Sequence, residues 1–174
     1  MNEYSTELRI PQDRVAVLVG KKGSTKRSFE RKTGTKIHVS KEGDVVISGD
    51  DSVVMYDVSN VVRAVGRGFN PEVALLLLGE EMMLEMVDMR DFSKNSKKRL
   101  ARMKSRLIGR KGLAWKMLES LTDTHLSVYG RTVALIGHLN EVMIAKQAVE
   151  RLLQGSPHGN VYRFIQNQRK AQPL

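Results

Sequence analysis

Two short stretches decide the fold of this chain: Val19-Gly20-Lys21-Lys22-Gly23 and Ile108-Gly109-Arg110-Lys111-Gly112. Each has two glycines three positions apart, two basic residues between them and an apolar residue in front. A shift of 89 residues superimposes the two stretches, and seven of the twenty positions from 20 to 39 are then identical, against about one expected by chance. A shift of 88 continues the match from Val45 on Val133 to Val73 on Val161. The chain therefore contains an internal duplication.

Each copy predicts the same order of elements: strand, helix, glycine loop, helix, two strands, helix. In the first copy we expect strands at residues 8–10, 35–39 and 45–47, and helices at 13–18, 24–32 and 51–66. In the second copy we expect strands at residues 85–89, 125–129 and 132–136, and helices at 95–107, 113–121 and 141–153. Helical extensions should begin near Asn70 and Ser156. This order predicts an α+β protein with domains at residues 1–79 and 80–174, each with a small antiparallel sheet and helices on one face.

The glycine loops indicate binding of phosphate groups. Glycine lets the backbone turn sharply and lets another chain approach without a Cβ atom in the way. The helix that follows offers unpaired amides and a partial positive charge, and Lys21, Lys22, Arg110 and Lys111 add formal charge. A single such loop is equally consistent with a helix–turn–helix corner bearing solvated lysines. Two loops in register favour the binding interpretation.

Composition points to the same kind of partner. The chain has 174 residues, a net charge of +10, a sequence pI of about 10.0 and 41% hydrophobic residues. Such a charge favours nucleic acid or another polyanion. With no cysteine, disulfides, Cys-ligated metals and thiol nucleophiles are excluded. No signal peptide begins the sequence and the longest apolar run, residues 73–78, is only six residues long, so we expect a soluble cytoplasmic protein without a membrane partner.

The loops and the order of elements around them resemble type I KH domains, in which a GXXG loop clamps the backbone of a single-stranded nucleic acid. The resemblance implies two KH folds in tandem, each strand–helix–helix–strand–strand–helix, with bases in a groove beside the loop. It also implies a set of RNA-binding residues, carried over position by position. They are Gly20, Lys21, Lys22, Gly23, Arg27, Lys36, Leu107, Ile108, Gly109, Arg110, Lys111, Gly112 and Lys116. By the same similarity, Leu18, Val19, Ile37, Val39, Leu126 and Val128 would line the grooves.

The match extends to a particular family. Arg9-Ile10-Pro11 before the first loop and the segment from Gly155 to Tyr162 after the second copy resemble the archaeal form of the partner-of-NOB-one family. That family comprises assembly factors of the small ribosomal subunit. The resemblance implies binding near the 3′ end of small-subunit rRNA, with a PIN-domain endonuclease and the alpha subunit of translation initiation factor two as protein partners. Eukaryotic members have a degraded first GXXG loop, whereas both glycines of the first loop are present here.

Charge favours the second copy as the stronger RNA-binding unit. Eleven Lys or Arg residues and a single acid, Asp91, lie between Arg90 and Lys116. A basic run alone more often forms a solvated helix face. This run leads directly into the second glycine loop, which favours RNA contact instead.

Other conspicuous residues receive structural interpretations. Trp115 lies on the apolar side of its helix and is expected in the core, and the methionines of residues 82–89 are typical of core or interface. The four histidines lack the spacing of a metal site, and we find no arrangement of catalytic side chains and no sign of a cofactor. We therefore expect a binding protein and no enzyme. An alternative is a protein-binding adaptor that uses the acidic residues 80–88 and the apolar run 73–78; a nuclease is a more distant one.

Overall fold

The computed structural model describes residues 3–173 and forms two compact units that divide between Glu80 and Glu81. Met1, Asn2 and Leu174, the ends of the predicted domains, lie outside the described residues. Each unit is an α+β fold with its own three-stranded antiparallel sheet, which confirms the predicted fold class. We refer to residues 1–80 as unit 1 and residues 81–174 as unit 2.

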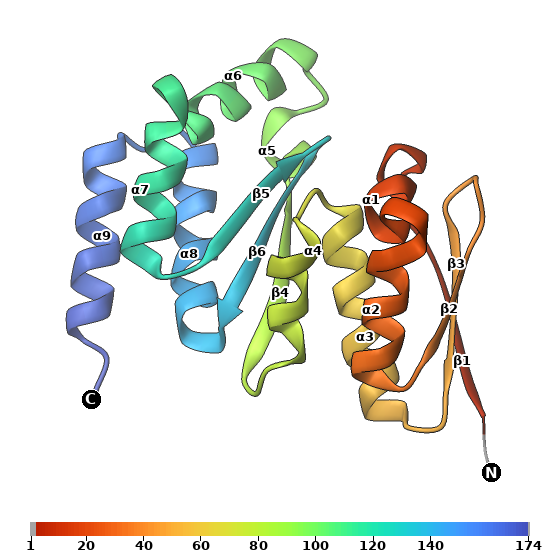
Figure 1. Cartoon of the computed structure of the whole chain (residues 1–174). Coiled ribbons are helices and arrows are strands. Elements are labelled where there is room, and N and C mark those ends of the chain that lie inside the picture. Colours follow the sequence, from red (N-terminus) through yellow and green to blue (C-terminus); the bar gives the residue numbers. More distant parts are fainter. Residues whose placement is uncertain (1–2, 174) are drawn as a thin grey trace. The chain divides into compact units, whose positions relative to one another are not determined.

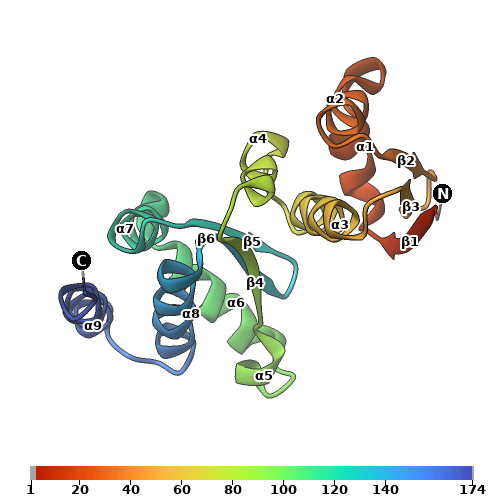
Figure 2. The same cartoon turned by 90° about the horizontal axis from the view of Figure 1, so that it is seen from below.

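Unit 1 contains a sheet with strand order β1-β3-β2 and helices on one of its faces (Figure 1, Figure 2). Its α-helices and strands are β1 (Tyr4–Arg9), α1 (Val15–Val19), α2 (Ser24–Thr33), β2 (Lys36–Val39), β3 (Asp44–Gly49), α3 (Ser52–Gly66) and α4 (Pro71–Ala74). Short 3₁₀ turns add η1 (Gln12–Arg14), η2 (Lys21–Gly23) and η3 (Leu75–Leu78).

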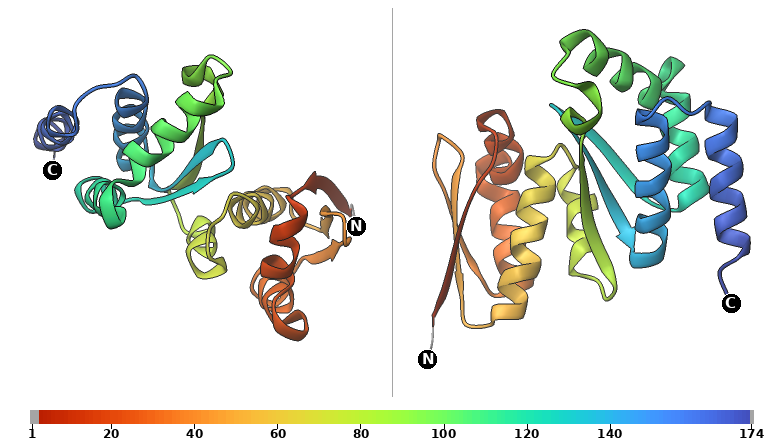
Figure 3. Two further views of the ribbon diagram at one scale, coloured as in Figure 1. Left: turned by 90° about the horizontal axis from the view of Figure 1, so that it is seen from above. Right: turned by 180° about the vertical axis from the view of Figure 1, so that it is seen from behind.

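Unit 2 repeats this plan with strand order β4-β6-β5 (Figure 1, Figure 3). Its α-helices and strands are β4 (Met82–Asp88), α5 (Arg90–Ser93), α6 (Lys97–Ile108), α7 (Leu113–Thr122), β5 (His125–Tyr129), β6 (Thr132–His138), α8 (Leu139–Leu153) and α9 (His158–Lys170), with the 3₁₀ turn η4 (Arg110–Gly112). The C-terminal helix α9 packs against α7 and α8.

The alternation of the strands places each core on the helix side of its sheet. In unit 1, Leu8 pairs with Val45 and Ile37 pairs with Ile47, and Ile37, Val45 and Ile47 are buried. In unit 2, one cluster joins the strands to the helices: its strand residues are Val87, Leu126, Val133 and Leu135, and its helix residues include Met103, Leu107, Leu118, Val149 and Ile165. Burial of this apolar surface stabilises the helix pair that flanks each glycine loop.

Helix ends follow ordinary capping chemistry. The Asp51 carboxylate accepts hydrogen bonds from the amides of Val53 and Val54 at the start of α3, and the Asn70 side chain accepts one from Glu72 at the start of α4. The expected extension of unit 1 is short, because α4 ends at Ala74 and continues only as η3. Helix α5 was not expected from the sequence; Lys94 and Asn95, with φ of 49° and 61°, separate it from α6.

Candidate nucleic-acid interface

The first glycine loop turns the chain sharply between α1 and α2. Gly20 ends α1 with φ 74° and ψ 174°, and its amide donates to the Ala16 carbonyl. Lys22 follows with φ 52° and ψ 31°, and Gly23 begins α2 with φ 75° and ψ 15°. The Gly23 amide closes the turn by donating to the Gly20 carbonyl at 3.2 Å. Three of the four loop residues therefore adopt positive φ angles.

The second glycine loop has almost the same backbone. Gly109 has φ 72° and ψ 176°, Lys111 has φ 53° and ψ 27°, and Gly112 has φ 72° and ψ 16°. Each of these angles differs by at most 4° from its counterpart in the first loop. Both loops thus hold a lysine in the left-handed region, where L-residues lose about 1–2 kcal/mol. Such shared backbone strain is typical of functional sites.

The first and the second glycine of a loop differ in what an added Cβ atom would meet. A Cβ atom on Gly20 would lie 2.8 Å from the Thr25 amide nitrogen, and one on Gly109 would lie 2.9 Å from that of Ala114. A Cβ atom on Gly112 would meet no atom within 4 Å. The first glycine is therefore required by the fold in both loops. The second glycine has open space beside it at Gly112, and at Gly23 that space is bordered by the Arg27 guanidinium, whose Nη1 would lie 3.1 Å from an added Cβ atom. That space lets another backbone come close to the loop.

The start of the next helix adds hydrogen-bond donors to this space. Glycine is the N-cap residue of both α2 and α7, so no N-cap side chain occupies the first amides of either helix. Lys21, Lys22, Arg110 and Lys111 are exposed around these amides. Backbone donors and cations in one place form an arrangement that suits phosphate groups.

Arg27 and Lys116 are exposed one turn into α2 and α7. The Arg27 guanidinium reaches back to the loop, because its Nη1 lies 3.1 Å from the position of a Cβ atom on Gly23. Arg27 is thus placed together with the loop residues, and its contact with RNA stays a prediction.

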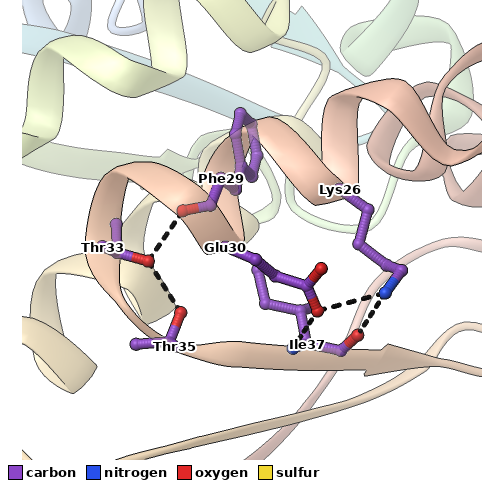
Figure 4. A network of polar contacts seen from close by, with 6 residues as sticks. All are labelled: Lys26, Phe29, Glu30, Thr33, Thr35 and Ile37. Atoms are coloured by element: carbon purple, nitrogen blue, oxygen red, sulfur yellow. Dashed lines mark hydrogen bonds and ion pairs between the residues drawn. The ribbon is translucent and has the colours of Figure 1, made fainter.

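A network of polar contacts fixes α2 to β2, the strand that follows it (Figure 4). The Glu30 carboxylate accepts from the Ile37 amide at 2.9 Å and from the Lys26 ammonium at 3.1 Å, and Lys26 also donates to the Ile37 carbonyl. Partial burial raises the pKa of Glu30, but the hydrogen bonds from Ile37 and Lys26 outweigh burial, so its pKa lies below the ordinary value. The Thr33 hydroxyl donates to the Phe29 carbonyl and is 2.7 Å from the Thr35 hydroxyl.

Unit 2 repeats this network with one change. The Leu126 amide donates to the Glu119 carboxylate at 2.9 Å, and the Thr122 hydroxyl contacts the Leu118 carbonyl and the Thr124 hydroxyl. Trp115 replaces Lys26 and packs partly buried against the core, as predicted. Three identities of the repeat, the glutamate and two threonines, therefore anchor the helix after each loop to the strand that follows it.

The structure corrects part of the predicted groove. Leu107 is 1% exposed and belongs to the core cluster of unit 2, and Leu18 is fully buried. These two side chains are closed to solvent, whereas Val19 and Ile108 are half-buried next to the glycines. Ile37 and Leu126 are likewise core residues, at 2% and 3% exposure.

The position of Lys36 also differs from the one expected for a residue that contacts RNA beside the loop. It is exposed at the start of β2 and precedes Ile37, which points into the core. Successive side chains of a strand point to opposite faces, so Lys36 points to the sheet face away from the helices. A contact from Lys36 to RNA in the groove would have to pass around the edge of the sheet.

Two arginines of the basic run have partners within unit 2 that sequence reasoning missed. Arg106 donates from Nη1 to the Leu152 carbonyl at 2.8 Å and from Nη2 to the Ser156 carbonyl at 2.7 Å. His158 in turn donates to the Arg106 carbonyl at 2.8 Å. Arg90 pairs with Asp88, and hydrogen bonds from Arg90 hold the pKa of that carboxyl below its ordinary value. Ser156 and His158 belong to the segment from Gly155 to Tyr162 that stands out in the sequence, and that segment is the sequence feature that points to the Arg106 contacts.

The acidic and apolar residues of the adaptor alternative are mostly engaged within their units. Glu85 pairs with Lys146 at 3.2 Å, and Ala74 and Leu77 are buried while Leu76 is 41% exposed. Across residues 3–173, no helix is long and apolar enough to cross a membrane. The same residues contain no group of three or more His, Cys, Asp or Glu side chains that could hold a metal ion.

Comparisons with known proteins agree with this geometry. Residues 83–170 match a family described as eukaryotic-type KH domain (KH-domain type I), and residues 5–56 match the KH domain family. A KH domain-containing protein of Methanocaldococcus jannaschii is 43% identical over 167 residues, which cover 94% of this chain and 73% of the relative.

A solved structure and a eukaryotic relative narrow the assignment. The archaeal Dim2p of Pyrococcus horikoshii, solved in complex with a/eIF2alpha and rRNA, is 40% identical with a TM-score of 0.91, covering 98% of this chain and 96% of that one. The pre-rRNA-processing protein PNO1 of Debaryomyces hansenii is 27% identical over 105 residues, which cover 60% of this chain and 41% of the relative. With both units matching KH families and with these relatives, the chain belongs to the partner-of-NOB-one family of tandem KH-domain proteins.

Proposed function

We propose that this protein binds single-stranded RNA through its two glycine loops and acts in assembly of the small ribosomal subunit, near the 3′ end of its rRNA. The observation that carries the proposal is the loop geometry, which agrees within 4° between two units of different sequence. Both loops leave helix amides and basic side chains open on one side, as a phosphate backbone requires.

In the proposed binding mode, different groups of the protein contact the phosphates and the bases of the RNA. Loop amides and the exposed cations Lys21, Lys22, Arg110 and Lys111 would hold the sugar–phosphate chain. Val19 and Ile108, half-buried beside the loops, would contact the bases. Phosphate contacts then supply most of the affinity, and base contacts supply the preference for sequence.

We take the RNA target and one protein partner of this chain from what its relatives are reported to bind. The similar Dim2p structure contains rRNA and a/eIF2alpha, and the yeast relative is named for pre-rRNA processing. We extend both to this chain: rRNA as ligand and the initiation-factor subunit as protein partner, in the cytoplasm. A PIN-domain endonuclease as a further partner rests on the family resemblance. We propose a binding function without catalysis, with any cleavage of the rRNA carried out by such a partner.

Crosslinking of the full chain to total cellular RNA, followed by mapping of the contact sites, tests this function. We expect enrichment at the 3′ end of small-subunit rRNA. A variant with Arg110→Asp and Lys111→Asp should lose this enrichment, and Asp is suited to the left-handed conformation at position 111. Enrichment on messenger RNA, or unchanged crosslinking of the variant, would contradict the proposal.

A protein-docking role remains a second candidate because of one cavity in unit 2. A cavity of about 590 Å³ lies between the start of β4 and the start of α8, lined by Glu81, Met82, Met83, His138, Leu139, Asn140 and Glu141. Its mixture of acids and exposed apolar side chains, with Leu139 53% exposed, suits a protein segment better than RNA. Capture of purified initiation-factor alpha subunit that survives RNase treatment, and is lost on Leu139→Asp, would support docking there.

A further inference from the structure

The two units differ by an insertion immediately before the second glycine loop. Eleven positions separate the end of β1 at Arg9 from Gly20, whereas twenty-one separate the end of β4 at Asp88 from Gly109. The ten additional residues form α5 and lengthen the helix before the loop (Figure 1). Helix α6 has 12 residues, whereas α1 has 5. Unit 1 forms the same fold without them, so the insertion is not required by the KH fold.

The insertion and the first part of α6 are strongly basic and exposed. Lys94, Lys97, Lys98, Arg99 and Arg102 are all exposed to solvent. The buried contacts of α6 come instead from Met103 and Leu107. These cations therefore contribute little to the core and remain available to a ligand.

Part of this charge forms a row that leads to the glycine loop. Lys98, Arg102, Ser105 and Gly109 are spaced by four, three and four residues, and residues so spaced lie on one face of a helix. All but the half-buried Gly109 are exposed. Eleven residue steps separate Lys98 from Gly109, which is about 16 Å along the helix axis. The small Ser105 side chain leaves room between Arg102 and the loop.

A small basic cavity lies at the start of α6, where Lys97, the neighbour of Lys98 in the sequence, contributes to its lining. This cavity of about 200 Å³ is lined by Arg90, Ser93, Asn95, Ser96, Lys97, Leu100 and Arg131. Three of these seven residues are cations and none is an acid. The ion pair with Asp88 holds the Arg90 side chain in place. At ~30 Å³ per water molecule, the cavity has room for a phosphate group.

We propose that α6 extends the RNA site of unit 2: a strand that leaves the glycine loop continues along Lys98 and Arg102, with a phosphate in the cavity between Arg90, Lys97 and Arg131. This inference rests on the proposed RNA-binding function and adds a second, phosphate-binding segment to it. Unit 1 contains no equivalent, because α1 begins only five residues before Gly20. Unit 2 should therefore hold a longer strand than the four nucleotides that a KH groove clamps.

The test compares a short and a long RNA on the full chain. The probes are single-stranded oligonucleotides from the 3′ end of small-subunit rRNA, of about four and about twelve nucleotides. For Lys98→Ala with Arg102→Ala, affinity for the long probe should fall roughly tenfold at 0.1 M salt, and its salt slope should decrease by about 1.4. Affinity for the short probe should stay within about twofold, because the loop that holds it is unchanged.

A charge-matched control separates this site from general electrostatics. Arg163→Ala with Lys170→Ala removes the same two charges from exposed positions of α9 and should leave binding of both probes nearly unchanged. Equal losses in the two double variants, or equal losses for short and long probes, would overturn the extended site while RNA binding itself stands. A wild-type chain that binds neither probe would instead refute the proposed function.

Discussion

At the scale of single residues, the two glycines of a GXXG loop are constrained by different things. Gly109 has a backbone conformation that is almost restricted to glycine, and its missing Cβ makes room for the Ala114 amide. Gly112 adopts an ordinary left-handed conformation next to open space. The fold of the loop requires glycine at the first position. At the second position the fold tolerates a side chain better, so a requirement for glycine there would come from binding.

Gly109→Ala and Gly112→Ala should therefore separate stability from binding. We expect Gly109→Ala to lower the free energy of unfolding by about 3 kcal/mol or more, from backbone strain and the clash with Ala114. Gly112→Ala should lower it by only about 1–2 kcal/mol, yet weaken RNA binding strongly because its Cβ occupies the space for the RNA backbone. Denaturant unfolding and RNA titration measure the two effects. Unchanged RNA affinity in folded Gly112→Ala would show that the ligand does not approach this side of the loop.

At the scale of elements, each loop depends on a helix that is tied to the neighbouring strand. Glu30 joins α2 to β2 through the Ile37 amide, and Glu119 joins α7 to β5 through the Leu126 amide. A carboxylate that accepts from a backbone amide and an ammonium is stabilised in its charged form. This contact makes the stability of unit 1 dependent on pH.

The low pKa of Glu30 predicts a loss of stability in acid. Because its pKa is lower in the folded than in the unfolded chain, the contribution is complete above about pH 4.5 and is lost as the pH falls through the folded pKa. Glu30→Gln should cost about 1–2 kcal/mol at pH 7, and this difference should shrink below pH 4. Denaturant unfolding from pH 3 to pH 7 measures it, with the exposed Glu72→Gln as a control of equal charge. A difference that stays constant with pH would contradict the assignment.

Two of the three arginines of helix α6, Arg102 and Arg106, lie one turn apart and have different roles. Arg106 donates to carbonyls at the end of α8 and at Ser156, and charge-assisted hydrogen bonds of this kind are worth about 1.5–3 kcal/mol each. Arg102 is exposed and faces outward. Arg14 makes a similar contact in unit 1, donating to the Val65 carbonyl in the last turn of α3 and to the Phe69 carbonyl three residues after that helix.

Arg106→Ala should thus mainly reduce stability, whereas Arg102→Ala should mainly reduce RNA affinity. We expect Arg106→Ala to lower the free energy of unfolding by about 2–3 kcal/mol, and Arg102→Ala to change it by less than about 0.5 kcal/mol. For a long RNA, Arg102→Ala should weaken binding more than Arg106→Ala does, at a temperature where both variants are folded. Denaturant unfolding and RNA titration on the same preparations compare them. If Arg102→Ala destabilised the chain as much as Arg106→Ala, the division of roles would be wrong.

At the scale of the whole molecule, the duplication made the fold and the loops predictable. Two glycine loops in register, together with helical and strand periodicity, were sufficient for the order of elements and the sheet type. Periodicity could not tell that Leu107 is a core residue and Ile108 is not, since both are apolar and adjacent. It could also not reveal the contacts of Arg106, whose partners lie 46 and 50 residues away. Local pattern predicts elements, whereas long-range packing decides which side chains remain for a ligand.

Charge is divided very unequally between the two units. Residues 1–80 carry 12 Lys and Arg against 11 Asp and Glu, whereas residues 81–174 carry 17 against 8. Nearly the whole net charge of +10 therefore belongs to unit 2. Since the affinity for RNA and its salt dependence come largely from phosphate contacts, similar loops in the two units should contribute unequally.

Charge reversal in one loop at a time measures this inequality on the full chain. Arg110→Asp with Lys111→Asp should reduce RNA affinity more than Lys21→Asp with Lys22→Asp, because the loop of unit 2 acts together with the basic surface of α6. The salt slope should fall by about 0.7 for each phosphate contact that is lost, and by more in the unit 2 variant. Both variants change four units of charge at exposed positions of the same backbone conformation, so each serves as the control for the other. Equal losses of affinity and slope would mean that loop geometry alone sets the binding, and that the charge around unit 2 serves another partner.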